Sequence, residues 1–301
     1  PISSGGEDGF LSKFGNVAAM KSHGVELSLS TTNIQTKDFS WKTNFIYSYI
    51  HNEITELRTR NNMISLISGV GYARQGYPSR ALFSVPFMGL TSDGLPTFRD
   101  QDGNISVTGV NFQESDPEKL SFLKYEGPTD PTNTGSLGNV FTYKGLTLNV
   151  FITYSFGNVV RLYPAFRSRY SDLSATPKEF RNRWRQPGDE AHTNIPTIAT
   201  YRQVFEDTYL LRAYNAYNYS DVRTAKGDFI RMKELSLNYD LPQKLIGHVG
   251  LRNASVKLQG TNLFLIYADK KLNGQDPEFF NTGGVAVPMA KQFTLTLKVG
   301  L

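Results

Sequence analysis

The chain has 301 residues, of which 13% are aromatic, with 20 Phe and 16 Tyr against 2 Trp. This composition disfavours intrinsic disorder, which is poor in aromatic residues, and it also disfavours a helical bundle, which would repeat apolar residues every ~3.6 positions. The net charge of +5 is dispersed along the sequence, so the basic stripe that nucleic-acid binding usually needs is not indicated.

No stretch of the sequence approaches the ~18 to 20 consecutive apolar residues of a membrane-spanning helix. A transmembrane β-barrel would leave no such stretch, because its strands are apolar only at every second position. The chain begins Pro1-Ile2-Ser3-Ser4-Gly5-Gly6, which lacks the basic and apolar regions of a signal peptide. We therefore expect a processed chain or a fragment of a longer one.

Apolar residues alternate with polar ones in several segments, and this two-residue period predicts β-strands with one apolar face. The clearest segment runs from Leu146 to Phe156, and the end of the chain repeats it. We expect strands near residues 22–35, 38–53, 65–75, 78–90, 132–144, 145–158, 224–241, 251–267 and 288–301, with a weaker one at 9–19. Several reach the ~9 to 11 residues that a tilted strand needs to cross a bilayer.

The connections between these strands alternate in length. The short ones lie near residues 35–37, 75–77, 143–145 and 242–250, and the medium or long ones are 54–64, 91–131, 159–223 and 268–287. Outer-membrane barrels have short periplasmic turns and long extracellular loops. We therefore expect Leu301 to lie in the periplasm and the 159–223 loop to be extracellular. Within that loop, Thr176 and Pro177 predict the start of a short helix that continues to Trp184.

Four groups of residues follow one another from about residue 20 to the end of the chain. They are Gly24-Val25-Glu26-Leu27 with Asp38-Phe39-Ser40-Trp41 and Asn44-Phe45; Gly127-Pro128-Thr129 through Pro131, Gly135-Ser136-Leu137 and Tyr143-Lys144-Gly145-Leu146; Phe229-Ile230-Arg231-Met232-Lys233-Glu234-Leu235-Ser236-Leu237-Asn238-Tyr239; and Gly260-Thr261-Asn262-Leu263-Phe264. In this order and spacing they resemble the C-terminal half of SusC/RagA-type TonB-linked outer-membrane proteins.

The resemblance implies an all-β fold, a transmembrane antiparallel β-barrel of roughly 22 strands with a plugged lumen. Residues 1–301 would form the C-terminal part of that one domain, with about ten strands. The resemblance also implies an N-terminal plug, a segment that contacts TonB and a SusD-like surface lipoprotein. The final alternation at Phe293, Leu295, Leu297, Val299 and Leu301 fits the barrel-assembly signal, although such barrels usually end in an aromatic residue.

No pattern of catalytic or metal-binding residues is evident, so we do not expect an enzyme or a cofactor. The four histidines are far apart in sequence, there is no cysteine, and neither a nucleophile elbow nor a phosphate-binding loop is present. Asp93-Gly94 and Asp100-Gln101-Asp102-Gly103-Asn104 are acidic and glycine-rich. They lack the closing Glu of a calcium loop, which favours plain Asp-Gly turns over calcium in an extracellular loop.

One stretch of the long loop is rich in tyrosine. Aromatic faces beside amide groups suit sugar rings or peptides, whereas the simpler interpretation is that these rings pack the loop or lie at the membrane interface. The residues in question are Tyr201, Tyr209, Tyr214, Asn215, Tyr217 and Tyr219. The simpler interpretation is favoured for them. Arg181, Arg183 and Trp184 precede this stretch and are candidates for contact with a partner, against the alternative of a solvated helix face.

These observations favour a TonB-dependent importer of oligosaccharides or peptides in a bacterial outer membrane. The chain would supply barrel wall and extracellular loops, and its partners would be a SusD-like lipoprotein, TonB through an absent N-terminal region, outer-membrane lipid and the substrate. A secreted β-sandwich that binds glycans through the tyrosine-rich stretch is the first alternative. An outer-membrane enzyme is the second, and it is disfavoured because no nucleophile, base and orienting group can be named.

Overall fold

The computed structural model describes all residues except 1, 4–11, 14–16, 168–175, 281–288 and 301, and the side chains of residues 201 and 249. The chain forms two compact units. The first, here called the loop unit, comprises Pro1–Ser22, Asn52–Thr129 and Val159–Ala225. The second, here called the sheet unit, comprises His23–His51, Asp130–Asn158 and Lys226–Leu301.

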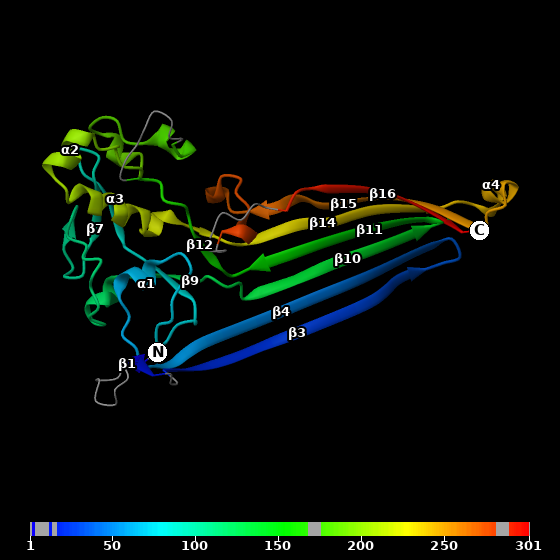
Figure 1. Ribbon diagram of the computed structural model, residues 1–301, viewed down its shortest axis with the longest axis horizontal. Helices are drawn as coiled ribbons and strands as arrows, with labels where there is room; N and C mark the ends of the chain where they lie inside the picture. The colour runs from blue at the N-terminus through cyan, green and yellow to red at the C-terminus, as the bar shows by residue number, and fades with distance from the viewer. Residues whose placement is uncertain (1, 4–11, 14–16, 168–175, 281–288, 301) are drawn as a thin grey trace. The chain divides into compact units, whose positions relative to one another are not determined.

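The sheet unit is built on a seven-stranded sheet in the order β16-β15-β14-β11-β10-β4-β3 (Figure 1). Strands that are neighbours in the sheet are therefore also consecutive among these seven along the chain. The strands are β3 (Ala18–Gln35), β4 (Phe39–Leu57), β10 (Asn133–Tyr143), β11 (Leu146–Phe156), β14 (Phe229–Asp240), β15 (Asn253–Ala268) and β16 (Gln292–Gly300). The pairs from β4 to β16 are antiparallel, so the sheet is an up-and-down meander.

Short connections join the strands at one end of this sheet. Between β3 and β4, the Thr36 N–H donates to the Phe39 carbonyl at 2.8 Å. Between β10 and β11, Lys144 and Gly145 have φ of 46° and 85°, the two positive values that a tight hairpin turn requires. Between β14 and β15 lie the short helices α4 (Gln243–Ile246) and η5 (Gly247–Val249). The connections after β4, β11 and β15 are long, so the expected alternation of lengths is present.

One of the predicted strands is wrong, and two others differ in extent or place from what was expected. Residues 65–75 begin inside helix α1 (Met63–Ile67), whose start is capped by the Asn62 side chain. Residues 78–90 form two short strands, β5 (Ala81–Ser84) and β6 (Phe87–Leu90), outside the seven-stranded sheet. All of β5 is buried, so its apolar residues reflect a packed core and not a membrane face. In the weak strand expected at 9–19, the described residues form β2 (Ser12–Lys13) and the start of β3 with Val17 before it, and residues 9–11 and 14–16 lie outside the described ones.

The loop unit holds short strands and helices. Besides β2, α1, β5 and β6, it contains β1 (Ile2–Ser3), β7 (Pro96–Arg99), β8 (Ile105–Ser106), η1 (Lys119–Phe122), β9 (Lys124–Pro128), β12 (Val159–Arg161), η2 (Lys178–Asn182), η3 (Asp189–Ala191), α2 (Tyr201–Glu206), α3 (Leu210–Asn218) and η4 (Asp221–Arg223), with β13 (Thr224–Lys226) at its end. Its core is rich in aromatic rings, including Phe83, Phe98, Phe166, Phe180, Tyr214 and Tyr217. Among the described residues, none of its helices has both the length and the apolar character needed to cross a membrane.

Two short helices complete the connection between β15 and β16 in the sheet unit, η6 (Lys270–Leu272) and η7 (Pro277–Phe279). The helix expected from Thr176 and Pro177 is the short 3-10 helix η2. It begins one residue later than expected, after Pro177, and no side chain caps it.

Candidate functional site

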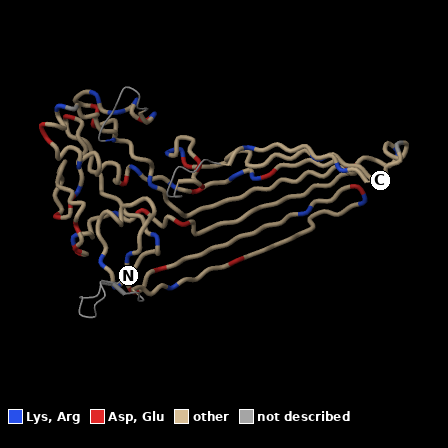
Figure 2. Tube along the Cα trace, viewed as in Figure 1, with Lys and Arg blue, Asp and Glu red and all other residues tan. Residues whose placement is uncertain are grey.

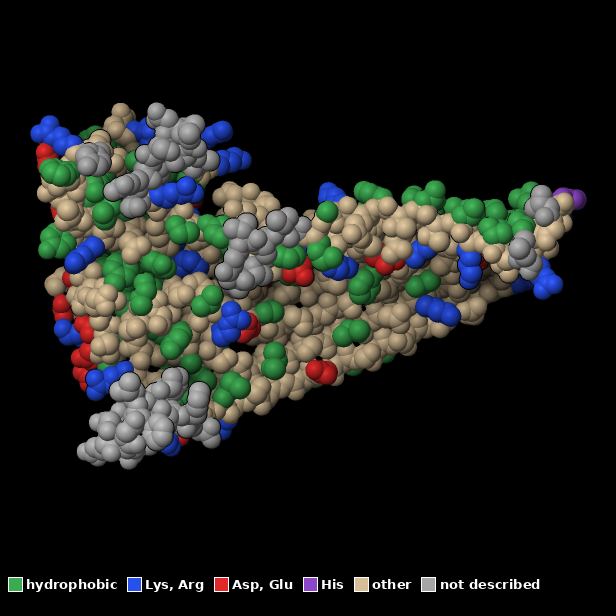
Figure 3. Space-filling view, viewed as in Figure 1, with side chains coloured by type: hydrophobic (Ala, Val, Ile, Leu, Met, Phe, Trp, Pro, Cys, Tyr) green, Lys and Arg blue, Asp and Glu red, His purple; other side chains and the backbone are tan. Residues whose placement is uncertain are grey.

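The seven-stranded sheet has one apolar face. Residues that oppose each other across paired strands share a face, and the pairs Leu148↔Leu237, Leu237↔Leu258 and Leu258↔Leu295 carry leucine across four strands. Leu258 is 55% exposed and Leu295 is 72% exposed. This apolar face comprises Leu137, Leu148, Val150, Ile152, Leu235, Leu237, Val256, Leu258, Phe293, Leu295, Leu297 and Val299 with their aromatic neighbours. Hydrophobic side chains follow the last strands in Figure 3.

Aromatic rings flank the apolar face at both ends of the strands. At the end with the short connections lie Phe39, Trp41, Phe141, Tyr143 and Tyr239, and at the other end lie Tyr47, Tyr49, Tyr154, Phe156 and Tyr267. Trp41 and Phe141 stack with their ring centroids 5.6 Å apart, and the Trp41 Nε1–H donates to the Asn139 side chain at 2.9 Å. Rings with an apolar body and a polar tip are the residues that occupy membrane–water interfaces.

The opposite face of the sheet is mostly polar. It carries hydroxyl and amide side chains such as Ser136, Asn149, Ser236, Gln259 and Thr296. Glu234 contacts other polar side chains of this face. Its Oε1 accepts a hydrogen bond from Asn149 Nδ2 at 3.1 Å and lies 3.9 Å from Lys257 Nζ. Charged residues are sparse along the seven strands as a whole (Figure 2). The sheet therefore separates an apolar face from a face suited to water.

The predicted assembly signal lies on the apolar face. Phe293, Leu295, Leu297 and Val299 oppose Gly260, Leu258, Val256 and Ala254 on β15. Leu301 lies outside the described residues.

The tyrosine-rich stretch divides into buried and exposed rings. Tyr214 and Tyr217 on α3 are buried against Phe166, with centroids 4.7 and 5.3 Å from it, and burial raises the pKa of Tyr217. Tyr219 is partly buried, whereas Tyr209 and Asn215 are exposed. The Tyr201 side chain lies outside the described ones. Two of these rings thus pack the loop, and the Arg212 guanidinium lies over the exposed Tyr209 ring, 4.8 Å from its centroid.

The predicted partner residues lie on and after η2. Arg181 is exposed, and its carbonyl accepts from Arg185 Nη2 at 2.7 Å. Arg183 Nη1 donates to the Phe180 carbonyl at 3.0 Å. Trp184 is half-buried, and its Nε1–H donates to Glu190 Oε2 at 2.9 Å. These contacts fix the shape of the loop, and Arg181 is the residue with the freest side chain.

The acidic, glycine-rich segments form turns. Asp100 is buried, and its Oδ1 accepts the backbone N–H groups of Asp102 and Asn104 at 3.0 and 2.9 Å. This is the geometry by which an Asp side chain closes its own turn. Within the described part of the chain, no three His, Cys, Asp or Glu side chains gather as metal ligands.

A buried arginine of the loop unit, Arg161, could not be predicted from the sequence. Arg161 on β12 donates to the carbonyls of Ser220 and Phe83, both at 2.7 Å, and to Ser84 Oγ at 3.0 Å. Burial lowers its pKa to about 10, and the Glu126 carboxylate opposes that shift. Arg161 thus stays charged at neutral pH and ties together segments distant in sequence.

Two further buried arginines hold loop segments in place. Arg223 Nη1 donates to both carboxylate oxygens of Glu179 at 2.7 Å and so holds η2 within the loop unit. In the sheet unit, Arg231 on β14 donates to Asp276, which precedes η7. Both arginines are less than one-tenth exposed. Alternation along a strand indicates the face on which an arginine lies. It does not predict which carboxylate in a distant loop will pair with that arginine.

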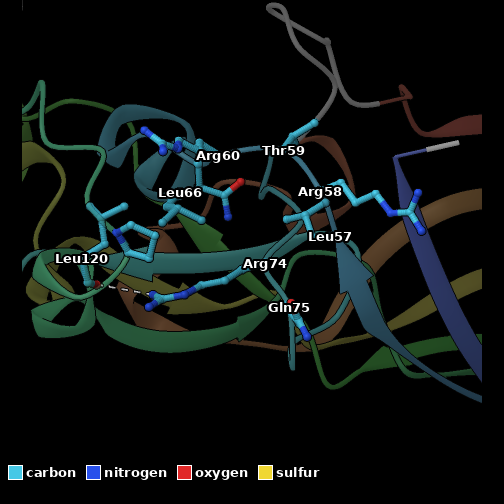
Figure 4. Close-up of a pocket in the computed structure, with 10 residues that line it drawn as sticks. Leu57, Arg58, Thr59, Arg60, Leu66, Arg74, Gln75 and Leu120 are labelled. Atoms are coloured by element: carbon cyan, nitrogen blue, oxygen red, sulfur yellow. Dashed lines mark hydrogen bonds between the residues drawn. The ribbon is translucent and has the colours of Figure 1, made fainter. Parts of the chain in front are cut away.

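The loop unit contains a pocket of about 340 Å³ between the end of β4, the start of α1 and helix η1 (Figure 4). It is lined by Leu57, Arg58, Thr59, Arg60, Asn61, Leu66, Arg74, Gln75, Pro117 and Leu120. Leu66 and Leu120 are fully buried and form its apolar wall. The lining includes three arginines and no acidic residue.

Comparison with known proteins identifies relatives along almost the whole chain, although no protein-family model matches it. The chain is 25% identical to TonB-dependent receptor P3 of Formosa agariphila over 291 residues, which is 90% of this chain and 26% of that receptor. It is 26% identical to receptor P26 of the same organism over 309 residues, 92% of this chain and 27% of the receptor. The chain thus spans about a quarter of the length of these relatives.

Two solved structures of the RagAB system share the fold of this chain. The structure of the RagAB peptide transporter matches 99% of this chain and 31% of its own with a TM-score of 0.71 and 24% identity. The RagAB peptide importer in the open-open state matches 100% of this chain and 31% of its own, with a TM-score of 0.73 and 23% identity. The relatives are receptors and transporters, not enzymes. Over nine-tenths of its length the chain is similar to TonB-dependent receptors, and the predicted resemblance to SusC/RagA-type TonB-linked outer-membrane proteins is thereby confirmed.

Proposed function

We propose that the chain supplies part of the wall and the loops of a TonB-dependent importer in a bacterial outer membrane. The observation that carries this proposal is the two-faced sheet, with apolar side chains flanked by aromatic rings on one face and polar side chains on the other. A strand in a barrel wall needs this alternation, because one face meets lipid and the other meets a wet lumen.

The dimensions of the apolar face fit a bilayer. On β11 the apolar residues extend from Leu146 to Tyr154, which is about 26 Å along the strand at a rise of ~3.3 Å per residue. A tilt of about 40° reduces this to roughly 20 Å across the membrane, near the ~25 Å apolar band of outer-membrane barrels. The aromatic rings then lie at the two interfaces, where such barrels carry their girdles.

The alternative of a soluble glycan-binding β-sandwich is not favoured. In a sandwich the apolar faces of two sheets bury each other, so Leu258 and Leu295 would be hidden. They are more than half exposed, and an apolar face of this extent in water would be a site of aggregation.

A closed barrel would also determine the strand number, the side of the membrane on which each connection lies, and the place of the partner and substrate. The seven strands would be the C-terminal portion of a closed barrel of roughly 22 strands, because edge strands such as β3 and β16 need partners. The short connections would lie in the periplasm, and the loop unit would lie outside the cell. A SusD-like surface lipoprotein would cover the pore, and the substrate would be peptides or oligosaccharides. The peptide transport named for RagAB supports the first of these substrates.

The experiment that tests the proposal uses the full-length receptor in its own organism. The receptor is expected in the outer-membrane fraction, and deletion of its gene is expected to abolish uptake of one class of peptide or oligosaccharide. Collapse of the proton-motive force is expected to stop uptake while leaving surface binding intact. A receptor found in the soluble fraction, or uptake unaffected by the deletion, would contradict the proposal.

A further inference from the structure

We propose that the loop-unit pocket binds the carboxylate end of an anionic substrate, with the Arg60 and Arg74 guanidinium groups as its cationic contacts and Asn61 as an acceptor for the neighbouring N–H or O–H donor. This proposal rests on the proposed function, because it assigns a substrate class to the imported molecule. The residues that line the pocket include three arginines and no carboxylate, so the pocket is positively charged.

The three arginines differ in how free they are. Arg58 Nε lies 2.8 Å from Glu56 Oε1, so its charge is already matched, and Figure 4 shows its side chain directed away from Leu66 and Leu120. Arg60 is exposed, and it has no hydrogen-bond or ion-pair partner among the described residues. An unmatched guanidinium offers a planar fork of donors that fits a carboxylate.

Arg74 is held in position by aromatic rings and a neutral carbonyl. Its guanidinium lies over the rings of Phe83 and Tyr77, 4.9 and 5.6 Å from their centroids. Its Nη1 donates to the Leu120 carbonyl at 3.4 Å, a weak hydrogen bond to a neutral group (Figure 4). Burial lowers its pKa from the ordinary 12.5, so Arg74 is a partly desolvated cation. Partial desolvation strengthens its attraction for an anion relative to that of a cation in open water.

Asn61 adds a second kind of contact. Its Nδ2 donates to the Ala73 carbonyl at 2.9 Å, which fixes the orientation of the amide. Its Oδ1 is buried and has no hydrogen-bond partner. A buried acceptor without a donor is costly, and a ligand with an N–H or O–H group beside its carboxylate would satisfy it. Peptide termini and uronic-acid sugars both have this combination.

The volume of the pocket limits how much of the substrate it can hold. Its volume of about 340 Å³ lies near the lower end of the ~300 to 1,000 Å³ of ligand pockets. It would therefore take one terminal unit of a chain, while the remaining units extend away from it.

The test measures binding by the full-length receptor in detergent at low ionic strength, by titration calorimetry. The probes are tetraglutamate and tetragalacturonate, with amidated tetraglutamine and maltotetraose as their neutral counterparts. At least one acidic probe is expected to bind more tightly than its neutral counterpart, and which one does so identifies the substrate source. Arg60→Gln is expected to weaken that binding about fivefold or more, because it removes a charge-assisted contact.

Two further variants make the result specific. Asn61→Asp places a carboxylate beside the arginines at nearly constant volume, and it is expected to abolish binding of the acidic probe. Arg99→Gln removes an exposed charge from β7 in the same unit and is expected to change nothing. Equal binding by wild type and Arg60→Gln, or no preference for either acidic probe, would overturn the proposal. If that happened while the receptor still fractionated with the outer membrane and supported uptake, the pocket assignment alone would fail.

Discussion

Arg231 on β14 places its Nη2 atom 2.5 and 2.6 Å from the two carboxylate oxygens of Asp276, which lies in the connection between β15 and β16. Both side chains are buried, being 8% and 10% exposed. The pair therefore holds the long connection against the strand.

Asp276→Asn is expected to release this connection, because a buried guanidinium left without its carboxylate costs about 3 kcal/mol or more. The measurement is the rate of trypsin cleavage after Lys270 and Lys271 in the full-length receptor. Glu278→Gln is the control, since Glu278 lies 3.3 Å from Arg231 but is 44% exposed, and such a pair is worth ~1 kcal/mol or less. Equal cleavage rates in the two variants would contradict the role of Asp276.

A second prediction compares two neighbouring residues on β15 that lie on opposite faces. Leu258→Arg places a charge on the apolar face and is expected to destabilise the membrane-inserted protein by about 2 to 4 kcal/mol. Gln259→Arg places the same charge on the polar face and is expected to cost far less. Folded and unfolded fractions after urea titration in lipid vesicles measure the difference. Equal destabilisation by the two variants would contradict the assignment of one face to lipid and the other to water.

A third prediction concerns two glycines on β10. Tyr154 covers Gly135 and donates its hydroxyl to the Ile46 carbonyl at 2.9 Å, and a Cβ at Gly135 would lie 2.1 Å from that carbonyl oxygen and 2.3 Å from the Tyr154 oxygen. A Cβ at Gly138 would meet nothing closer than 3.4 Å. Gly135→Ala is therefore expected to destabilise the protein by about 1 to 3 kcal/mol, whereas Gly138→Ala is expected to be nearly neutral. The thermal midpoints of the two variants in detergent test this order.

A fourth prediction follows from the buried arginine of the loop unit. Arg161→Met removes the hydrogen bonds to the Phe83 carbonyl, the Ser220 carbonyl and Ser84 Oγ, and the Ser220 carbonyl keeps the Arg223 N–H as a donor. The expected loss is about 3 kcal/mol or more of loop-unit stability. Hydrogen exchange should rise in α1, β5 and η4 and stay unchanged in β14 to β16. Uniform protection in the variant would contradict the central role of Arg161.

A fifth prediction concerns pH. Burial raises the pKa of Glu126 above its ordinary 4.5, although Lys124 and Ser84 favour the charged form. The stability that the protonated carboxyl contributes is fully present below pH ~4.5 and is lost as the pH rises through the raised value. Glu126→Gln is therefore expected to be more stable than wild type at neutral pH, by an amount that shrinks as the pH falls toward 4.5. A difference that does not change with pH would contradict the raised pKa.

The strands of the sheet could be predicted from the sequence because a two-residue period is a local pattern. Leu146 to Phe156 and Phe293 to Val299 alternate visibly, and the structure has β11 and β16 there. The strand expected at 78–90 differs in its place, because β5 is buried on all sides and lies outside the seven-stranded sheet. The strands expected at 65–75 and 78–90 both lie between β4 and β10, and neither belongs to the seven-stranded sheet. The alternation of short and long connections in that sheet is therefore unchanged.

The pocket could not be predicted in the same way. It brings Arg60, Arg74 and Leu120 together from three connections, and no spacing in the sequence indicates that they meet. The sequence shows that this stretch is rich in tyrosine. Only the fold shows that Tyr214 and Tyr217 are buried and that Tyr209 is exposed.

The central claim is that one face of the sheet meets lipid and the other meets water. The most direct measurement places a spin label at Leu237→Cys or Ser236→Cys, neighbours on β14 with opposite faces, in the full-length receptor reconstituted in vesicles. The chain contains no cysteine that would compete for the label. The account predicts that the label at 237 is relaxed by oxygen dissolved in lipid and the label at 236 by a water-soluble nickel chelate. Relaxation of both labels by the nickel chelate alone would contradict it.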